Sequence, residues 1–312
     1  MLEISGDADA GAEVARLKLI EEIAKFSDVD GVHATPVPRL SFIRRSHPTE
    51  PMHAVHKPAL CMIVQGTKQV VVGEKVFNYD ASRHLVVSLD VPVIGQVVAA
   101  TPEAPYLCVK LDLDPAVIGS VLLESRVAPQ AVNPACKCLG LSRTTPDLFD
   151  AMTRLASLAR APQDIAYLAP LIEREIIYRL LSGEQAAQLR QIAIAESRLE
   201  QVGRAVELLR ERFAEAVRMD DLANAAGMSA SSFFQHFKQV TAMSPLQYQK
   251  RLRLQHARKL ILTLGYDAAA AGHEVGYDSP SQFSREYARL FGAPPLKDIA
   301  RLKAAGETLL DT

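Results

Sequence analysis

The sequence of 312 residues is poor in cysteine and aromatic residues: it has four cysteines, 6% aromatic residues and no tryptophan. No two cysteines form a Cys-x-x-Cys pair, which argues against a zinc motif and a disulfide framework. No apolar run approaches the roughly 18 residues of a membrane span, and no basic segment followed by an apolar one marks an export signal. We therefore expect a cytoplasmic protein with no membrane partner.

Catalytic motifs are missing as well. The sequence shows no nucleophile elbow, no phosphate-binding glycine loop and no paired-carboxylate motif. His53 and His56 would lie on opposite faces of a strand, and Pro51 and Pro58 favour a loop at this place. Surface or capping positions therefore explain the histidines of this region better than metal binding: His47, His53, His56 and His84. We expect no cofactor, no metal and no enzymatic activity.

The overall charge of −1 hides an asymmetry along the chain. Residues 227–303 contain 11 Lys and Arg against 5 Asp and Glu, a local charge of +6, so the remainder sums to −7. The composition, 48% hydrophobic and 23% charged, is that of a globular protein, and the length predicts two domains. A polyanionic partner is expected for the C-terminal domain only.

The first half of the chain changes from helical to β texture. Apolar residues with helical spacing predict a helix over 10–27, and five prolines in 31–58 indicate loop and edge strand. Short β-rich runs separated by turn residues then predict an antiparallel sandwich or small barrel. The expected strands are 60–64, 69–72, 76–79, 84–89, 93–98 and 106–113.

Helices follow this β region. Asp114-Pro115 is a helix-start signal, and that helix is expected to run to about Glu124. A cysteine-bearing loop (127–144) precedes two helices over 146–160 and 163–182. This helical hairpin is equally suited to partner contacts and to packing on its own sheet. The stretch 184–197 is the expected hinge between the domains.

The second half contains an internal duplication with an offset of 50 residues. Each copy predicts a helix, a turn at Gly227 or Gly276, and a second helix, which is a helix-turn-helix unit. The pairs that establish the duplication are Ser229 with Ser279, Ser231 with Ser281, Phe233 with Phe283, Phe237 with Tyr287, Pro245 with Pro295 and Leu246 with Leu296.

The duplication also predicts which side chains face outward. Phe233, Phe237 and Val240 recur at helical spacing and must face inward, as must their counterparts Phe283, Tyr287 and Leu290. The positions left on the exposed faces are Ser231, Phe234, Gln235, Ser281, Ser284 and Arg285. A helix over 245–263, about 28 Å long, would hold the two units apart by nearly the groove repeat of about 34 Å. Its cations are expected near phosphates: Lys250, Arg251, Arg253, Arg258 and Lys259.

Residues 244–260 (SPLQYQKRLRLQHARKL) and 275–295 (VGYDSPSQFSREYARLFGAPP) resemble the signature of the AraC/XylS family of bacterial transcription regulators, over about 197–303. Residues 58–66 (PALCMIVQG) and 168–175 (LAPLIERE) resemble the cupin-like effector domain of one subgroup, over about 30–190. The resemblance implies an α+β protein. Residues 1–190 would form a cupin-like antiparallel β-barrel with a helical hairpin, and residues 197–303 an all-α double helix-turn-helix.

The resemblance also implies a function: a sequence-specific DNA-binding regulator controlled by a small-molecule effector. Its partners would be promoter DNA, RNA polymerase and, through segments between 114 and 182, a second copy of the chain. Phe234-Gln235 replaces a His-Arg pair common in the subgroup, so no operator sequence is inherited. Gln235 suits adenine, Phe234 a thymine methyl group and Arg285 guanine.

Two alternatives concern the N-terminal domain. It could be a cupin-type enzyme tethered to DNA, against which the missing His-x-His metal motif argues, or a dimerisation module without a ligand. Cys61 and Cys108 lie in strands that are predicted to be apolar. They are either small buried hydrophobic residues or residues that line the effector pocket and react with electrophiles. Cys61 and Met62 must point to opposite sides of their strand, and we expect Cys61 to face the interior. Cys136 and Cys138 are read as two unconnected loop thiols.

Overall fold

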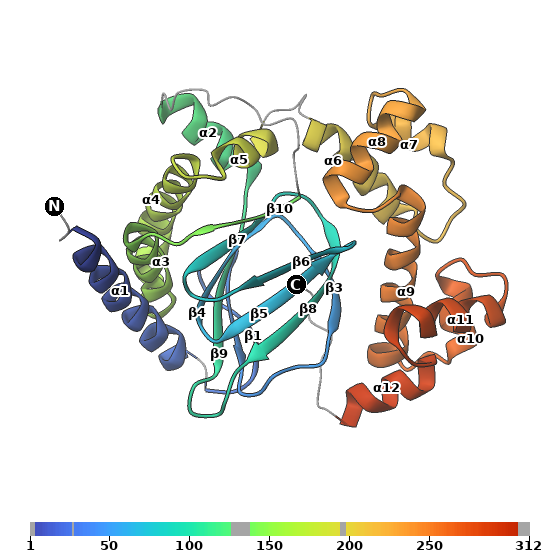
Figure 1. Ribbon diagram of the computed structural model, residues 1–312, viewed down its shortest axis with the longest axis horizontal. Coiled ribbons are helices and arrows are strands. Elements are labelled where there is room, and N and C mark those ends of the chain that lie inside the picture. The colour runs from blue at the N-terminus through green and yellow to red at the C-terminus, as the bar shows by residue number, and fades with distance from the viewer. Residues whose placement is uncertain (1–3, 27, 126–137, 194–197, 305–312) are drawn as a thin grey trace.

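The computed structural model describes residues 4–26, 28–125, 138–193 and 198–304. Figure 1 shows three layers: N-terminal helices on one side, β-strands in the middle, and the C-terminal helices on the other side. Most helices and strands begin and end within a few residues of the bounds predicted from the sequence. Within the described residues, no helix is both long and apolar enough to cross a membrane.

The strands form two antiparallel sheets that face each other. The order in one sheet is β1-β2-β9-β4-β7-β10, and in the other β3-β8-β5-β6. The bounds are β1 Gly31–Ala34, β2 Leu40–Arg45, β3 Met52–His56, β4 Ala59–Gln65, β5 Thr67–Val72, β6 Lys75–Tyr79, β7 Arg83–Val87, β8 Val91–Ala99, β9 Tyr106–Asp112 and β10 Leu139–Arg143. Because no ladder joins the two sheets in the described part of the chain, the expected barrel is open rather than closed.

The proline-rich segment and the cysteine-bearing loop contain more strand than the sequence predicted. Within 31–58, β1 and β3 are edge strands as proposed, but β2 lies inside the larger sheet. The loop 127–144 contains β10, which pairs with β7 from Leu139 opposite Val87 to Arg143 opposite Arg83. These strands are held by non-local pairing, so local patterning underestimates them.

Both faces of the larger sheet are covered. On β4, Leu60, Met62 and Val64 belong to the buried cluster under the helices, whereas Cys61 and Ile63 belong to the cluster between the sheets. This alternation follows from the two-residue period of a strand. It explains why the run around Cys61 is apolar without interruption.

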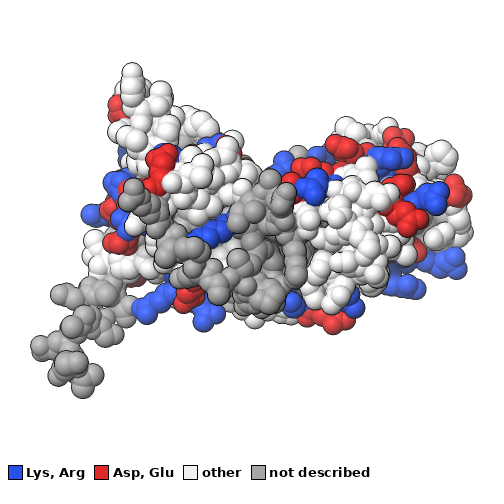
Figure 2. All heavy atoms as spheres, turned by 90° about the horizontal axis from the view of Figure 1, so that it is seen from above, with Lys and Arg blue, Asp and Glu red and all other residues white. Residues whose placement is uncertain are grey.

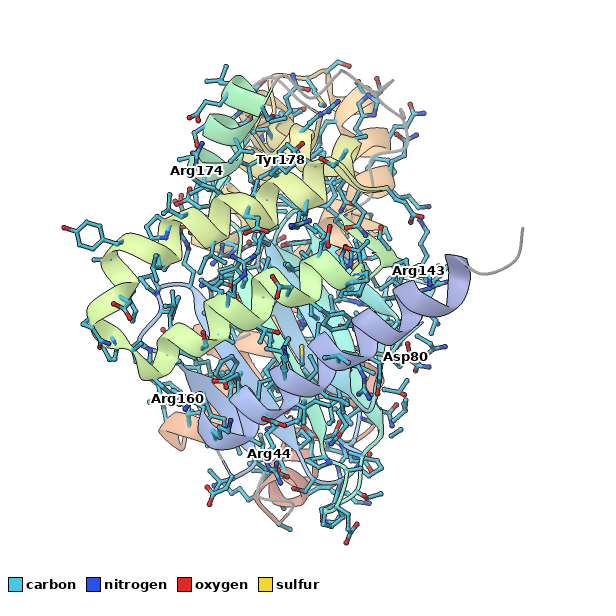
Figure 3. All side chains as sticks on the ribbon, turned by 90° about the vertical axis from the view of Figure 1, so that its left-hand side faces the viewer. Arg44, Asp80, Arg143, Arg160, Arg174 and Tyr178 are labelled. Carbon is cyan, nitrogen blue, oxygen red and sulfur yellow. The ribbon has the colours of Figure 1, made fainter. Side chains whose placement is uncertain are left out.

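The N-terminal helices are α1 Ile4–Phe26, α2 Pro115–Ser125, α3 Pro146–Ser157, α4 Pro162–Leu181 and α5 Ala186–Ala193. Figure 3 shows α1, α3 and α4 side by side as one layer over the sheet. Arg160 ties the end of this hairpin to Glu22 of α1 through an ion pair of 2.5 Å. The inner faces of α3 and α4 pack on their own sheet, since their buried side chains belong to one cluster with Leu60 and Met62 of β4. The expected hinge is partly wrong, because α5 occupies most of it and packs on α2 and α4.

The C-terminal helices are α6 Arg198–Glu211, α7 Met219–Ala225, α8 Ala230–Thr241, α9 Pro245–Leu264, α10 Ala268–Glu274, α11 Pro280–Phe291 and α12 Pro295–Ala304. The turns at Gly227 and Gly276 have φ values of 65° and 83°, a conformation that favours glycine. Ser229 and Ser279 cap α8 and α11. Each predicted helix-turn-helix is thereby confirmed.

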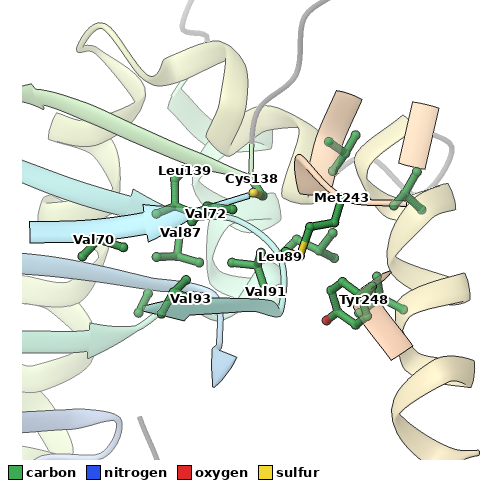
Figure 4. Packing of buried hydrophobic residues seen from close by; sticks show 14 of the residues in the cluster. Val70, Val72, Val87, Leu89, Val91, Val93, Cys138, Leu139, Met243 and Tyr248 are labelled. Atoms are coloured by element: carbon green, nitrogen blue, oxygen red, sulfur yellow. The ribbon is translucent and has the colours of Figure 1, made fainter. Parts of the chain in front are cut away.

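The two domains share one buried core. Leu89 and Val91 of the β-domain lie in the same cluster as Met243 and Tyr248 of the C-terminal domain, and Figure 4 shows these side chains facing each other across the junction. The turn of the β5–β6 hairpin also contacts the residue that caps the C-terminus of α8, because a Cβ at Gly73 would clash with the Ala242 carbonyl oxygen. The domains are therefore packed against each other over an apolar surface.

Candidate nucleic-acid interface and ligand site

The second helix of the first unit, α8, has the predicted faces. Phe233 and Phe237 are fully buried, and Phe237 meets Tyr248 of α9 edge-on with ring centroids 5.6 Å apart. Ser231 and Gln235 are exposed, and the Phe234 ring is 46% exposed. The outward face of α8 therefore carries the three side chains that the duplication left exposed: Ser231, Phe234 and Gln235.

The second unit repeats this arrangement on α11. Phe283 and Tyr287 are buried, Ser281 and Arg285 are exposed, and Ser284 is partly exposed. α8 and α11 thus each carry the exposed polar positions that the duplication predicted. Both helices start with a serine cap: Ser229 accepts a hydrogen bond from the Ser232 N–H group, and Ser279 accepts one from the Gln282 N–H group.

The cations of α9 have more specific roles than the sequence suggested. Arg258 is 2% exposed and donates two hydrogen bonds, of 2.8 and 2.9 Å, to the buried carboxylate of Asp298. Arg253 donates to the carbonyl oxygens of Phe213 and Gly276, at 2.6 and 2.9 Å. The expectation that these two arginines lie near phosphates is therefore wrong, because both hold the C-terminal helices together.

Lys250 and Arg251 lie nearer the surface. Lys250 forms an ion pair of 3.0 Å with Glu286 of α11, and burial lowers the pKa of Arg251. Both line a cleft of about 990 Å³ between the two units and the β5–β6 hairpin, together with Lys75, Gln235, Lys238 and Arg289. On the face of the C-terminal domain that Figure 2 shows, acidic and basic side chains are interspersed.

A second candidate site lies between the two sheets, where the strand register sets the side-chain neighbours. On the larger sheet Cys61 lies opposite Lys110, and Ile63 opposite Cys108. On the smaller sheet Lys68 lies opposite Tyr79. The prediction that Cys61 faces inward is confirmed, since Met62 belongs to the cluster under the helices.

The thiols in this interior are not activated. Burial raises the pKa of Cys61, and burial followed by the nearby Cys61 raises the pKa of Cys108 to about 12. Both residues therefore stay protonated and make poor nucleophiles. Cys138 is buried at the domain junction, whereas Cys136 lies outside the described residues.

The polar side chains of this interior were not predicted from the sequence. His56, Lys68 and Lys110 are 4%, 8% and 7% exposed, and Tyr79 and Tyr106 are also buried. For His56 and His84 the expected surface position is wrong, since both are buried. Lys68 shares the parity of the inward-facing Val70 and Val72, and this alternation was the available signal. In the described segments, no three His, Cys, Asp or Glu side chains gather as metal ligands.

Comparison with known families assigns both domains. A model of the AraC-type transcriptional regulator N-terminus matches residues 36–188, and a helix-turn-helix domain model matches residues 222–301. A model of bacterial regulatory proteins of the tetR family matches residues 203–239, which include the first unit alone.

Individual relatives are more distant. The RCS-specific activator RclR of Escherichia coli is 32% identical over 94 residues, 30% of this chain and 33% of that protein. The activator RhaS of Escherichia fergusonii is 29% identical over 146 residues, 46% of this chain and 50% of its own length. The chain thus spans a third to a half of the length of these curated relatives.

A solved structure extends the likeness to the whole fold. Fatty-acid-bound ToxT of Vibrio cholerae aligns with a TM-score of 0.53 at 11% identity, covering 86% of this chain and 96% of that chain. At this identity the likeness concerns the fold alone. The two matched models cover a sheet domain and a double helix-turn-helix domain, and the chain belongs to the AraC/XylS family of transcription regulators.

Proposed function

We propose that the protein is a sequence-specific DNA-binding transcription regulator whose N-terminal domain, about residues 1–190, binds a small-molecule effector. The observation that carries the proposal is the exposed polar face on each of α8 and α11, joined through α9. α9 has 20 residues, and its length of about 30 Å approaches the groove repeat of about 34 Å. The two helices can therefore enter successive major grooves.

Within this proposal, the residues that contact bases differ from those that contact the DNA backbone. Gln235 would read adenine, Arg285 guanine, and Phe234 would contact a thymine methyl group, while Ser231, Ser281 and Ser284 provide short hydroxyl contacts. Lys250 and Arg251, at the edge of the cleft, would contact phosphates. We place the protein in the cytoplasm, where promoter DNA and RNA polymerase are available as partners.

The effector would bind between the two sheets, where Cys61 and Cys108 face inward. Among the similar proteins, one ToxT structure holds an unsaturated fatty acid and RclR is named an RCS-specific activator, and these names support a small-molecule effector here. An effector changes promoter occupancy only if it favours one arrangement of the domains. The shared core at Leu89 and Met243 provides a direct route for such coupling.

A homodimer is part of the same proposal. The outer face of α4 exposes Leu168, Tyr178 (seen in Figure 3), Leu171 at 63% and Tyr167 at 82%. An apolar stripe of this size on one helix is typical of a protein contact. A second copy of the chain, placing its own α4 on this stripe, would bury it, and size-exclusion chromatography with light scattering would detect the dimer.

The test is a selection of duplex DNA from a randomised library with the full-length protein. We expect one enriched motif with two half-sites about one helical turn apart, and an affinity that falls steeply with salt. Phe234→Ala combined with Arg285→Ala should abolish the enrichment, whereas Leu123→Ala, on the exposed side of α2, should not. A folded protein that enriches no sequence would overturn the proposal.

A further inference from the structure

The interior between the sheets concentrates polar groups among aliphatic ones. Lys68, Tyr79 and His56 come from the smaller sheet, and Tyr106 and Lys110 come from one strand of the larger sheet. All five are at most 8% exposed; we call them the interior site. The Lys68 side chain crosses β8, since a Cβ at Gly95 would lie 3.2 Å from its Cε and 3.7 Å from its Nζ.

Several groups of the interior site lack a partner among the residues that the structure describes. His56 Nδ1 and the hydroxyls of Tyr79 and Tyr106 are buried without a hydrogen bond. No carboxylate of the described residues pairs with Lys68, whereas Lys110 lies 3.2 Å from Asp112 Oδ1. Since buried polar groups are almost always satisfied, a set of unpartnered groups converging from two sheets is typical of a binding site.

The charges in this interior do not balance. The interior contains two ammonium groups, those of Lys68 and Lys110. Among the described residues, one carboxylate pairs with either of them: that of Asp112, which pairs with Lys110. Burial, followed by the charges of Lys68 and Lys110, holds the pKa of His56 well below its usual value, so this imidazole is neutral near pH 7. The interior therefore carries a surplus of one positive charge, which is costly at low dielectric unless an anion compensates it.

We propose that the interior site binds a small organic monoanion, a carboxylate with a compact apolar body, as the effector of this regulator. The inference rests on the proposed function, whose effector it specifies. The carboxylate accepts hydrogen bonds from the ammonium group of Lys68 and from the Tyr79 and Tyr106 hydroxyls. Its body packs against Val70, Val97 and other aliphatic walls of the same cluster.

The charge count favours a carboxylate over a phosphate. A monoanion cancels the surplus charge, whereas a phosphate dianion would leave a net negative charge in a buried space. The site also contains no arginine among its five members, and arginine is the residue best matched to phosphate geometry. The aliphatic walls further disfavour a strongly hydrated ion.

The experiment uses the full-length protein with sodium hexanoate and sodium benzoate as probes, followed by calorimetric titration and thermal melting. Hexanamide and benzamide are the matched neutral controls, and inorganic phosphate is the dianion control. We expect at least one carboxylate to bind and to raise the melting temperature by mass action, and neither amide to do so. Equal binding of acid and amide, or no binding by either carboxylate, would overturn the inference.

Variants connect the binding to the interior site. Lys68→Met should weaken carboxylate binding about ten- to hundredfold while keeping or raising the melting temperature, because it removes an unpaired buried charge. Lys18→Met, on α1 and exposed, should change neither. Unchanged carboxylate affinity in Lys68→Met, or a lowered melting temperature with binding intact, contradicts the proposed role.

DNA binding by the same preparations separates the two proposals. Carboxylate binding that leaves DNA affinity unchanged supports the site and contradicts its role as the effector site. Sequence-specific DNA binding without carboxylate binding overturns the present inference and leaves the proposed DNA-binding function standing.

Discussion

The hydroxyl of Tyr248 donates a hydrogen bond of 2.8 Å to the backbone carbonyl of Asp90. Tyr248 lies on α9 between the two helix-turn-helix units, and Asp90 lies between β7 and β8 of the sheet domain. The Asp90 carboxylate also pairs with Arg210 of α6. One loop of the N-terminal domain is thus fixed to two helices of the DNA-binding domain.

Removing the Tyr248 hydroxyl should destabilise the folded protein. Tyr248→Phe keeps the ring against Phe237 but leaves the Asp90 carbonyl buried without this donor, which costs about 1–3 kcal/mol. Urea denaturation of the full-length chain measures the loss. Tyr167→Phe, whose ring is 82% exposed, is the matched control and should leave the free energy of unfolding unchanged. Equal stability of both variants would show that the hydrogen bond is not maintained in solution.

Arg285→Ala should relax base preference at one operator position. If Arg285 forms a bidentate contact with guanine, its loss costs about 1–3 kcal/mol there and little elsewhere. Arg251→Ala should instead weaken binding to all sequences and reduce the salt dependence by about one ion. Affinities over an operator library at several salt concentrations distinguish these patterns, and a uniform loss in both variants contradicts the assignment of the exposed face of α11.

Breaking the buried ion pair of the second unit should be costly. Arg258→Ala leaves the Asp298 carboxylate, which is 0% exposed, with Tyr287 and Arg301 as its remaining side-chain donors in the described part of the chain. Loss of one partner of a buried pair costs about 3–5 kcal/mol. Denaturation curves should show this loss, while Arg289→Ala, an exposed position on α11, stays near the wild type. A small effect in Arg258→Ala would mean that Asp298 is satisfied without it.

Cys61→Ser and Met62→Ala should separate ligand response from stability. Met62 is buried under the helices, so its truncation costs about 2–5 kcal/mol with an unchanged effector response per folded molecule. Cys61 faces the interior, so the serine variant should fold and show an altered response. Melting temperature and effector-dependent promoter activity are measured for both. A destabilised Cys61→Ser protein with normal response would refute the pocket role of Cys61.

Stability should fall as the pH drops below 6.5, in part through His84. Burial lowers the pKa of His84 to about 4 in the folded protein, so between pH 6.5 and 4 only the unfolded chain takes up this proton. The contribution of neutral His84 to the free energy of unfolding is therefore complete above pH 6.5. It is lost toward pH 4, by about 1.4 kcal/mol per pH unit. His84→Gln should flatten the dependence of unfolding free energy on pH by that amount. Parallel curves for the two proteins contradict the depressed pKa.

The helix-turn-helix units were predictable because their signals are local. Ser229 and Ser279 cap their helices, Gly227 and Gly276 form the turns, and Phe233 and Phe283 mark the inner faces within one or two turns of helix. The exposed faces of α8 and α11 followed directly from these signals.

The features that were predicted wrongly or not at all depend on residues far away in the sequence. Arg258 was predicted to lie near phosphates, because its buried partner, Asp298, lies 40 residues further along the chain and leaves no local signal. β10 was interpreted as loop because Gly140 and Ser142 interrupt its apolar pattern, and its pairing with β7 determines the strand. The interior site requires the register of two sheets, which local periodicity does not contain.

The continuous core at Leu89, Val91, Met243 and Tyr248 bears on how such a chain can be rearranged by engineering or in evolution. A hybrid that joins this sheet domain to another member's DNA-binding domain would set foreign side chains against Leu89 and Val91, leaving gaps or overlaps in a close-packed interior. Successful exchange therefore requires that Met243, Tyr248 and the β7–β8 loop be transplanted together, wherever the crossover is placed.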